Sequence, residues 1–147
     1  AQRCEMVRLL TENLPWAELS AIEIERGGAS YTVDTLRQLA APDRQLFLII
    51  GTDMLLSFDK VWREPESICR LCTLVAYARG IGEQRLLEEK KRVLEQEFEA
   101  DIRVMARAPV PVSSTGVRGG GDLDRLVPPA VAAYIRKHQL YDRKNGK

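Results

Sequence analysis

Apolar residues along the chain follow two spacings that alternate from one segment to the next. Short apolar or alternating runs predict β-strands at residues 18–25, 46–50, 73–79 and 101–106. Apolar residues at helical spacing predict helices around and between them, at residues 2–14, 31–40, 52–58, 65–71, 82–98 and 128–141. Strands that alternate with helices are typical of a parallel sheet. The pattern therefore predicts an α/β fold, a Rossmann-like parallel sheet with flanking helices.

Residues 46–50 are apolar without interruption and lead directly into Gly51, Thr52 and Asp53. A strand without alternation is expected to be covered on both faces, as in a parallel sheet between helices. Ligands of open α/β sheets bind beyond the carboxyl ends of the strands, which is where Gly51 and Asp53 stand. Gly51 lets another group approach the backbone, and Asp53 offers two acceptors that suit sugar hydroxyls. An N-cap for the next helix explains Asp53 equally well.

Composition narrows the classes of protein that this chain can represent. Its 147 residues, 45% hydrophobic and 29% charged, are typical of one soluble domain spanning residues 1–147. The 22 basic and 21 acidic side chains nearly cancel, which argues against a nucleic-acid partner. No apolar run reaches the roughly 18 residues of a membrane span and no signal peptide is visible, so a cytoplasmic protein is expected.

Three cysteines raise the question of a metal site. Cys69 and Cys72 form one C-x-x-C pair, but there is no second pair and the only histidine, His138, is distant in the sequence. A zinc site needs four ligands, so buried, reduced thiols are expected instead.

Two segments offer groups that suit a flat, anionic ligand. The indole of Trp62 could stack on a heteroaromatic ring, an electron-poor pyridinium above all, although a packing tryptophan is commoner. Trp16 has no comparable neighbours and is expected to pack. Backbone amides near Tyr31, at a predicted helix start, could hold a small carboxylate. Plain capping by Ser30 or Thr32 is the alternative there.

A third segment carries hydroxyls at a possible helix start. Ser113, Ser114 and Thr115 precede Arg118 by about one turn. Backbone N–H groups, hydroxyls and a guanidinium that converge in this way form a phosphate site. An ordinary serine cap with a solvent-facing Arg118 explains the same residues.

Together, and in this order, these segments resemble the bacterial nicotinate-nucleotide adenylyltransferases, which belong to the nucleotidyltransferase α/β family and act in NAD biosynthesis. The resemblance spans nearly the whole chain. It is carried by RCEMVRLL, ELSAIEIERGGASYTVDTL, LIIGTDMLLSFDKVW, LVAYAR, VSSTGVR and VPPAVAAYIRKHQLY. Generic adenylyl- and cytidylyltransferases share the serine–threonine motif but not the combination of SYT-x-DTL with GTDML…W.

The resemblance implies adenylyl transfer from ATP, with Mg²⁺, to nicotinate mononucleotide, giving the deamido dinucleotide and pyrophosphate. Trp62 would stack on the pyridine ring. Main-chain amides around Tyr31 and Thr32, with that of Arg63, would receive the ring carboxylate and favour the acid over the amide.

On the nucleotide side, the resemblance places Gly51 and Asp53 against adenosine, with Asp53 on the ribose hydroxyls. It assigns the ATP phosphates to Arg79, Ser113, Ser114, Thr115 and Arg118.

The sequence also departs from the family. The family's R-P-G reads Arg79-Gly80-Ile81, and nothing matches the family's opening strand and GGTFDPxHxGH, whose histidines and threonine bind the triphosphate. The resemblance therefore assigns no catalytic residue and no metal ligand here, and the family's N-terminal strands are expected to be missing. Residues 46–50 would then lack a strand neighbour, an edge that another copy could cover in a homo-oligomer. Turnover by these residues alone is expected to be poor.

Two other interpretations stay open. A non-catalytic module would keep the Trp62 pocket and bind a pyridine nucleotide without chemistry, so that binding occurs and no product forms. A different nucleotidyl transfer, for example to phosphopantetheine, would leave Trp62 fluorescence unaffected by nicotinate mononucleotide.

Overall fold

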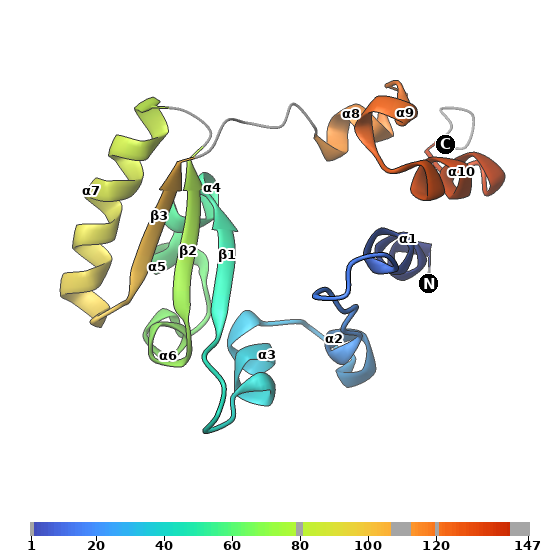
Figure 1. The fold of residues 1–147 in the computed structure, drawn as a ribbon. Helices are drawn as coiled ribbons and strands as arrows, with labels where there is room; N and C mark the ends of the chain where they lie inside the picture. Colours follow the sequence, from blue (N-terminus) through green and yellow to red (C-terminus); the bar gives the residue numbers. More distant parts are fainter. Residues whose placement is uncertain (1, 79–80, 107–112, 120, 142–147) are drawn as a thin grey trace. The chain divides into compact units, whose positions relative to one another are not determined.

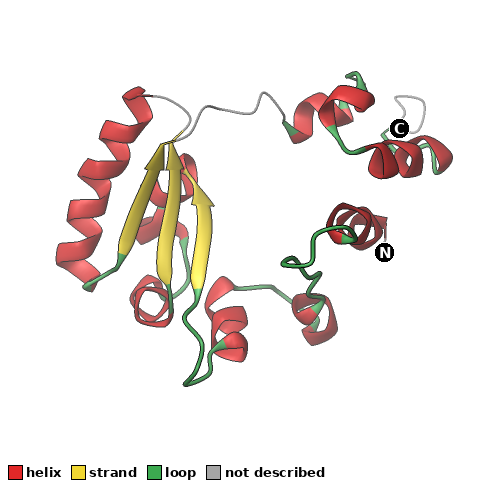
Figure 2. Cartoon of the chain, viewed as in Figure 1, coloured by secondary structure: helices red, strands yellow, loops and turns green. Residues whose placement is uncertain are grey.

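A computed structural model describes residues 2–78, 81–106, 113–119 and 121–141. The chain forms two compact units, Glu23–Pro109 and a second one made of Ala1–Ile22 and Val110–Lys147. The first unit carries the sheet, and the described residues of the second form helices and their connections (Figures 1 and 2).

The sheet has three parallel strands in the order β1-β2-β3 (Figure 1). They are β1 (Phe47–Gly51), β2 (Thr73–Ala78) and β3 (Ile102–Ala106). Ile49 of β1 is in register with Val75, and Leu74 of β2 with Ile102. The predicted α/β architecture is therefore confirmed. Within the described residues β1 pairs with β2 alone, so it has the open edge that was expected.

Helices connect the strands and build the core against one face of the sheet (Figure 2). The β1–β2 connection contains α4 (Thr52–Leu56), α5 (Phe58–Val61) and α6 (Pro65–Leu71), and α7 (Ile81–Phe98) joins β2 to β3. α4 and α7 contact the sheet, and α3 (Thr32–Leu39) packs against α6. The fully buried side chains of this core include Phe58, Ile68, Leu74, Leu87, Leu94 and Ile102.

The expectation that strand β1 is covered on both faces is wrong for the described residues. Ile50 is buried and Leu48 packs against the core, but Phe47 and Ile49 are 47% and 68% exposed. Successive side chains of a strand point to opposite faces, so Phe47 and Ile49 lie on the face away from the core. The uninterrupted apolar run does not by itself report two covered faces.

The strand predicted at residues 18–25 is also wrong, because the chain forms helix α2 (Ile22–Arg26) there. The helix brings Glu23 and Arg26, three positions apart, to one shared partner on α3, Thr35. Thr35 donates its hydroxyl to Glu23 at 2.7 Å, and Arg26 donates to the Thr35 hydroxyl at 3.0 Å and to Gln38 at 2.9 Å. These hydrogen bonds to α3 outweigh the strand-like alternation of Ile22 and Ile24, and Ile24 is 65% exposed.

The second unit contains α1 (Gln2–Thr11), α8 (Ser114–Arg118), α9 (Leu123–Leu126) and α10 (Pro129–Lys137). α10 packs against α1 and α9, and Arg136 of α10 donates two hydrogen bonds to Asp124 of α9, at 2.6 and 3.0 Å. The helices predicted at residues 2–14 and 128–141 are confirmed, although both are shorter. Trp16 is 80% exposed, so the expectation that it packs is wrong.

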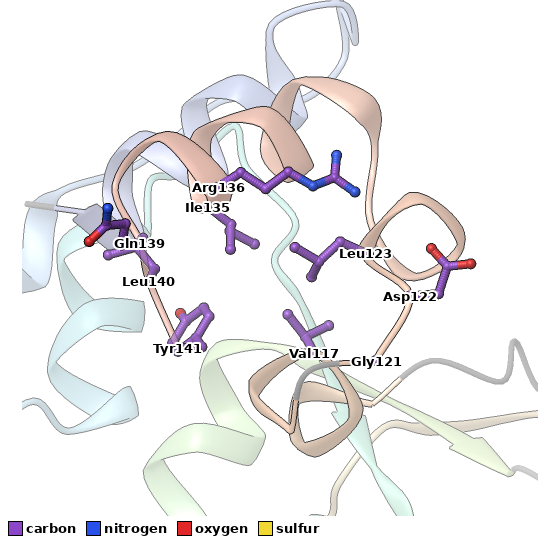
Figure 3. A pocket seen from close by; sticks show the side chains of 9 residues that line it. All are labelled: Val117, Gly121, Asp122, Leu123, Ile135, Arg136, Gln139, Leu140 and Tyr141. Atoms are coloured by element: carbon purple, nitrogen blue, oxygen red, sulfur yellow. The ribbon is translucent and has the colours of Figure 1, made fainter. Parts of the chain in front are cut away.

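A pocket of about 310 Å³ opens in this second unit (Figure 3). Apolar side chains of Val117, Leu123 and Ile135 point into it, and Gln139 lies near its rim. No sequence motif predicted this pocket.

Two of the three cysteines are buried, as expected, whereas Cys4 is only half-buried. Cys69 and Cys72 carry free thiols and are only 8% and 7% exposed. Burial raises the pKa of each thiol to about 11, so both are neutral at physiological pH. Among the residues that the structure describes, no helix has the length and apolarity needed to span a membrane.

Candidate functional site

One pocket of the sheet unit collects all four residues predicted to hold the pyridine nucleotide. It has a volume of about 300 Å³. Tyr31 and Thr32 reach it from the start of α3, and Trp62 and Arg63 from the end of α5. Met54 of α4 lines it as well. We call it the Trp62 pocket.

Trp62 belongs to this pocket and to the core. Its ring centroid is 5.2 Å from that of Phe58, with the ring planes inclined by 40°. Phe58 is fully buried, whereas Trp62 is half-buried and packs against the core cluster. The packing interpretation of Trp62 and the ligand-stacking interpretation are therefore compatible, because the core holds an indole that also lines the pocket.

The start of α3 differs from a plain capped helix. The N-cap residue is Tyr31, with φ −113° and ψ 133°, and its side chain makes no capping hydrogen bond. The Tyr31 carbonyl accepts from the backbone N–H groups of Asp34 and Thr35. Capping by Ser30 or Thr32 is therefore wrong, and backbone N–H groups of the first turn lack a hydroxyl cap. The Arg63 guanidinium carbon lies 4.4 Å from the centre of the Tyr31 ring.

A second pocket, also of about 300 Å³, lies where β1 ends and α4 begins. Gly51, Asp53, Met54 and Glu83 are among the residues that line it. α4 begins at Thr52 with Gly51 as its N-cap residue, so the interpretation of Asp53 as a cap is wrong. Asp53 is exposed in the first turn, and a Cβ added to Gly51 would meet no atom within 4 Å. Space for a ligand thus borders both predicted residues. We call this the Asp53 pocket.

Thr52 and Glu83 form a contact in the Asp53 pocket that sequence reasoning missed. Oγ1 of Thr52, a buried residue, lies 2.8 Å from Oε2 of Glu83 and 3.2 Å from the carbonyl oxygen of Tyr77. Glu83 follows β2 by a few residues, in the first turn of α7. Neighbouring parallel strands end at the same edge, so the position of Glu83 was a usable signal.

Met54 lines both the Trp62 pocket and the Asp53 pocket. Its side chain is 53% exposed. The two pockets therefore adjoin at one exposed methionine, an arrangement suited to a ligand with two ends.

The hydroxyl segment lies in the other unit. Ser113 is the N-cap residue of α8, and its Oγ accepts from the Gly116 N–H at 3.0 Å, so the interpretation of Ser113 as a cap is confirmed. Ser114, Thr115 and Arg118 are exposed on α8. A phosphate role for these residues stays a prediction, and Arg79 falls outside the described residues.

A comparison with protein-family models decides the family. The cytidylyltransferase-like model matches residues 1–120, which is most of the chain. The chain belongs to the cytidylyltransferase-like family. This family of nucleotidyltransferases has a Rossmann-like α/β fold, in agreement with the parallel sheet and its flanking helices.

Curated relatives within this family share most of the chain. A protein of Dehalococcoides mccartyi (strain ATCC BAA-2266 / KCTC 15142 / 195) is 37% identical over 98% of this chain and 73% of its own length. One of Geobacter metallireducens is 33% identical over 95% of this chain and 73% of its own length. One of Clostridium beijerinckii is 32% identical over 95% of this chain and 72% of its own length. All three are named probable nicotinate-nucleotide adenylyltransferase, so the family resemblance seen in the sequence is confirmed.

Members of this nucleotidyltransferase family typically use Mg²⁺, so the donor groups bear on how an ion would be held. In the described part of the chain, no three histidine, cysteine or carboxylate side chains come together in a way that could hold a metal ion. Asp53 and Glu83 line one pocket, and Thr52 lies at hydrogen-bond distance from Glu83. Within the described residues, this donor set does not fit a resident metal centre.

Proposed function

We propose that this chain transfers the adenylyl group of ATP to nicotinate mononucleotide, releasing pyrophosphate and forming nicotinate adenine dinucleotide. The observation that carries the proposal is the pair of pockets that share Met54. The first collects the four residues expected to hold the pyridine half, and the second collects the two expected to hold adenosine. The names of the relatives support the same reaction.

In the Trp62 pocket, the indole face stacks on the pyridinium ring of nicotinate mononucleotide. The ring carboxylate accepts hydrogen bonds from main-chain amides around Tyr31 and Thr32 and from that of Arg63. These groups are all donors, so they complement a carboxylate better than a carboxamide, whose NH₂ has no acceptor there. The guanidinium of Arg63, held over Tyr31, adds positive charge at the rim.

In the Asp53 pocket, Asp53 accepts hydrogen bonds from the ribose hydroxyls, and adenosine occupies the open space beside Gly51. The ATP phosphates are held by Ser114, Thr115 and Arg118, with Ser113 shaping the turn. Arg79 is proposed to contribute a further positive charge.

The chemistry needs no covalent enzyme intermediate. A phosphate oxygen of nicotinate mononucleotide attacks the α-phosphorus of ATP, a new P–O bond forms, and the bond to the departing pyrophosphate breaks. The protein contributes by aligning the reactants and stabilising negative charge. Mg²⁺ is proposed to arrive with ATP, since it is commonly held by substrate phosphates and only one or two carboxylates.

The test is a single-turnover experiment with this chain in excess over radiolabelled ATP. Nicotinate adenine dinucleotide and pyrophosphate should form together and only when nicotinate mononucleotide is present. Their formation should be slow, because the family's GGTFDPxHxGH does not occur in this sequence, and Trp62→Ala should slow it further. Trp16→Phe, a change at an exposed residue outside both pockets, is the control and should form product at the parent rate. Binding of nicotinate mononucleotide without any product would favour a non-catalytic binding module.

A further inference from the structure

The two walls of the Trp62 pocket come from segments that are distant in the sequence. Tyr31 and Thr32 stand at the start of α3, whereas Trp62 and Arg63 follow α5. A ring that stacks on the indole reaches the α3 amides only if the two segments keep a fixed separation. The residues that join them can therefore control binding without touching a ligand.

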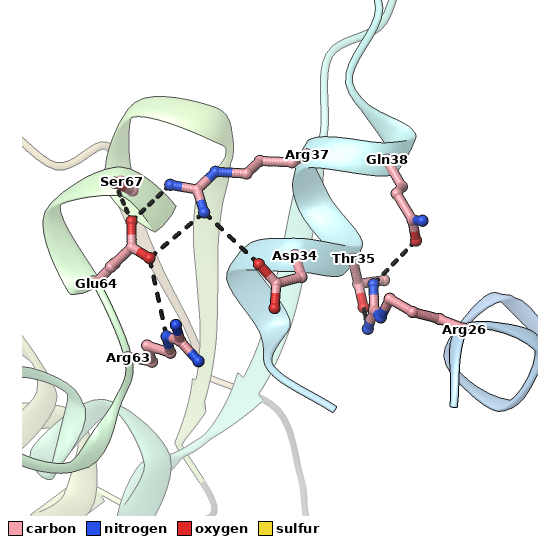
Figure 4. A network of polar contacts seen from close by, with 8 residues as sticks. All are labelled: Arg26, Asp34, Thr35, Arg37, Gln38, Arg63, Glu64 and Ser67. Atoms are coloured by element: carbon pink, nitrogen blue, oxygen red, sulfur yellow. Dashed lines mark hydrogen bonds and ion pairs between the residues drawn. The ribbon is translucent and has the colours of Figure 1, made fainter. Parts of the chain in front are cut away.

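An ion pair between Arg37 and Glu64 joins α3 to the segment that follows α5. Arg37 is in the last turn of α3, and Glu64 comes directly after Arg63. Arg37 Nη2 donates to Glu64 Oε2 at 2.5 Å and Nη1 donates to Oε1 at 3.4 Å, so the guanidinium contacts both carboxylate oxygens (Figure 4). Such two-point contacts fix orientation as well as distance.

Neighbouring groups hold the pair on both sides (Figure 4). Ser67 Oγ donates to Glu64 Oε2 at 3.2 Å, and Asp34 Oδ1 lies 3.6 Å from Arg37 Nη1. Nε of Arg63 lies 3.9 Å from Glu64 Oε1. Arg63 thus contacts the carboxylate through its Nε and lies over Tyr31, so the pair and the pocket rim form one connected network.

The backbone of Glu64 gives this ion pair a specific task. Glu64 has φ 51° and ψ 58°, a left-handed conformation that residues other than glycine rarely adopt. Its carbonyl accepts from the Ile68 N–H at 3.1 Å and so starts α6. Conformations of this kind persist when the surroundings determine them, and here Arg37 and Ser67 hold the side chain. The left-handed turn at Glu64 also fixes the direction in which Trp62 and Arg63 leave α5.

Arg37 and Glu64 are both charged at neutral pH. Hydrogen bonding from Arg37 lowers the pKa of the Glu64 carboxyl, and the same contact raises the pKa of Arg37. Both side chains are nonetheless exposed, and exposed ion pairs usually contribute little to stability. We therefore expect the pair to matter for the relative position of α3 and the segment after α5, and to contribute little to the free energy of unfolding.

We propose that Arg37 and Glu64 are a positioning pair that sets the separation between the α3 amides and Trp62, and through it the affinity for nicotinate mononucleotide. The ligand named here rests on the proposed function. The effect on the pocket itself does not, so the two can fail separately.

The test uses the full chain with Trp16→Phe, which leaves Trp62 as the only tryptophan. Arg37→Ala removes the ion pair, and Arg37→Lys keeps the positive charge but loses the two-point contact with Glu64. Arg37→Glu alone breaks the pair, and Arg37→Glu combined with Glu64→Arg restores it with the charges exchanged. Arg70→Ala is the matched control, because the ion pair of Arg70 with Glu66 lies within α6. The measurements are quenching of Trp62 by acrylamide, affinity for nicotinate mononucleotide, affinity for ATP and melting temperature.

Arg37→Ala should raise the acrylamide quenching of Trp62 and weaken nicotinate mononucleotide binding about three- to fivefold, with ATP affinity unchanged. Arg37→Lys should fall between Arg37→Ala and the parent. The reversed pair should recover at least half of the loss seen with Arg37→Glu alone. Arg70→Ala should match the parent throughout.

Two results would overturn the proposal: quenching and affinity in Arg37→Ala that equal those of Arg70→Ala, or equal losses of ATP and nicotinate mononucleotide affinity with a lowered melting temperature. If the parent does not bind nicotinate mononucleotide, the proposed function fails. The quenching comparison then decides the positioning pair on its own.

Discussion

The indole of Trp62 lies against the buried ring of Phe58, with centroids 5.2 Å apart, while it also lines the pocket proposed for a pyridine ring. A ligand-facing aromatic side chain is thus anchored by a core residue. The surface that would stack on a substrate is held in place before the substrate arrives, which lowers the ordering cost of binding.

The first prediction separates the two roles of Trp62. Trp62→Phe keeps a ring against Phe58 but offers a smaller stacking face, so the free energy of unfolding should fall by less than about 1.5 kcal/mol. Trp62→Ala removes both roles and should cost about 3 kcal/mol or more of stability. Denaturant unfolding and nicotinate mononucleotide titrations measure the two effects. A Trp62→Ala chain with parental affinity would show that no ligand stacks on this residue.

A second prediction concerns the anchor. Phe58→Ala empties a fully buried position and should lower the free energy of unfolding by about 3–5 kcal/mol. Ile24→Ala, at a position that is 65% exposed in the same unit, should change it by less than about 0.5 kcal/mol. Urea denaturation followed by circular dichroism measures both. Equal effects would contradict the position of Phe58 in the core.

A third prediction addresses the hydroxyl of Thr52. Thr52→Val is nearly isosteric but removes a buried hydroxyl that lies 2.8 Å from Glu83 Oε2, so it should cost about 1–3 kcal/mol of stability. Thr52→Ser keeps the hydroxyl and loses one methyl, about 0.8 kcal/mol. Thermal melts should therefore rank the parent first, Thr52→Ser second and Thr52→Val last. The reverse order of the two variants would mean that the hydroxyl contact is unimportant.

A fourth prediction follows from the buried thiols. The folded-state pKa of Cys69 and Cys72 is raised to about 11, from an ordinary value of 9.0. Between those values the unfolded chain loses thiol protons that the folded chain keeps, so stability should fall as pH rises from about 9 to about 11. At pH 8, a thiol reagent should modify Cys4 faster than either buried cysteine. Equal rates at all three cysteines in the folded chain would contradict the burial of Cys69 and Cys72.

The sequence predicted the elements that have a marked apolar pattern. Strands β1, β2 and β3 and helix α7 were placed within a few residues. β1 is an uninterrupted apolar run that ends at Gly51, and α7 has apolar residues at helical spacing. Residues 18–25 failed because two isoleucines at alternate positions mimic a strand. The hydrogen bonds that Glu23 accepts from α3 and that Arg26 donates to α3 depend on tertiary structure that the local pattern does not encode.

In the candidate site, too, some features were predicted from the sequence and others depend on tertiary structure. Tyr31, Thr32, Trp62 and Arg63 were predicted as one binding group, and they do line one pocket. Met54 and the Arg37–Glu64 pair were missed, because nothing in the spacing of these residues distinguishes them from an ordinary core contact or a solvated charge pair. The roles of Met54 and of the Arg37–Glu64 pair can be inferred only from the tertiary arrangement of α3, α4 and α6.

The most direct measurement is a titration of Trp62 fluorescence in the Trp16→Phe chain with nicotinate mononucleotide and, in parallel, with nicotinamide mononucleotide. The account predicts saturable quenching by the acid, with an affinity at least about tenfold higher than for the amide, a difference of about 1.4 kcal/mol. Quenching that is absent, or equal for the two ligands, would contradict it.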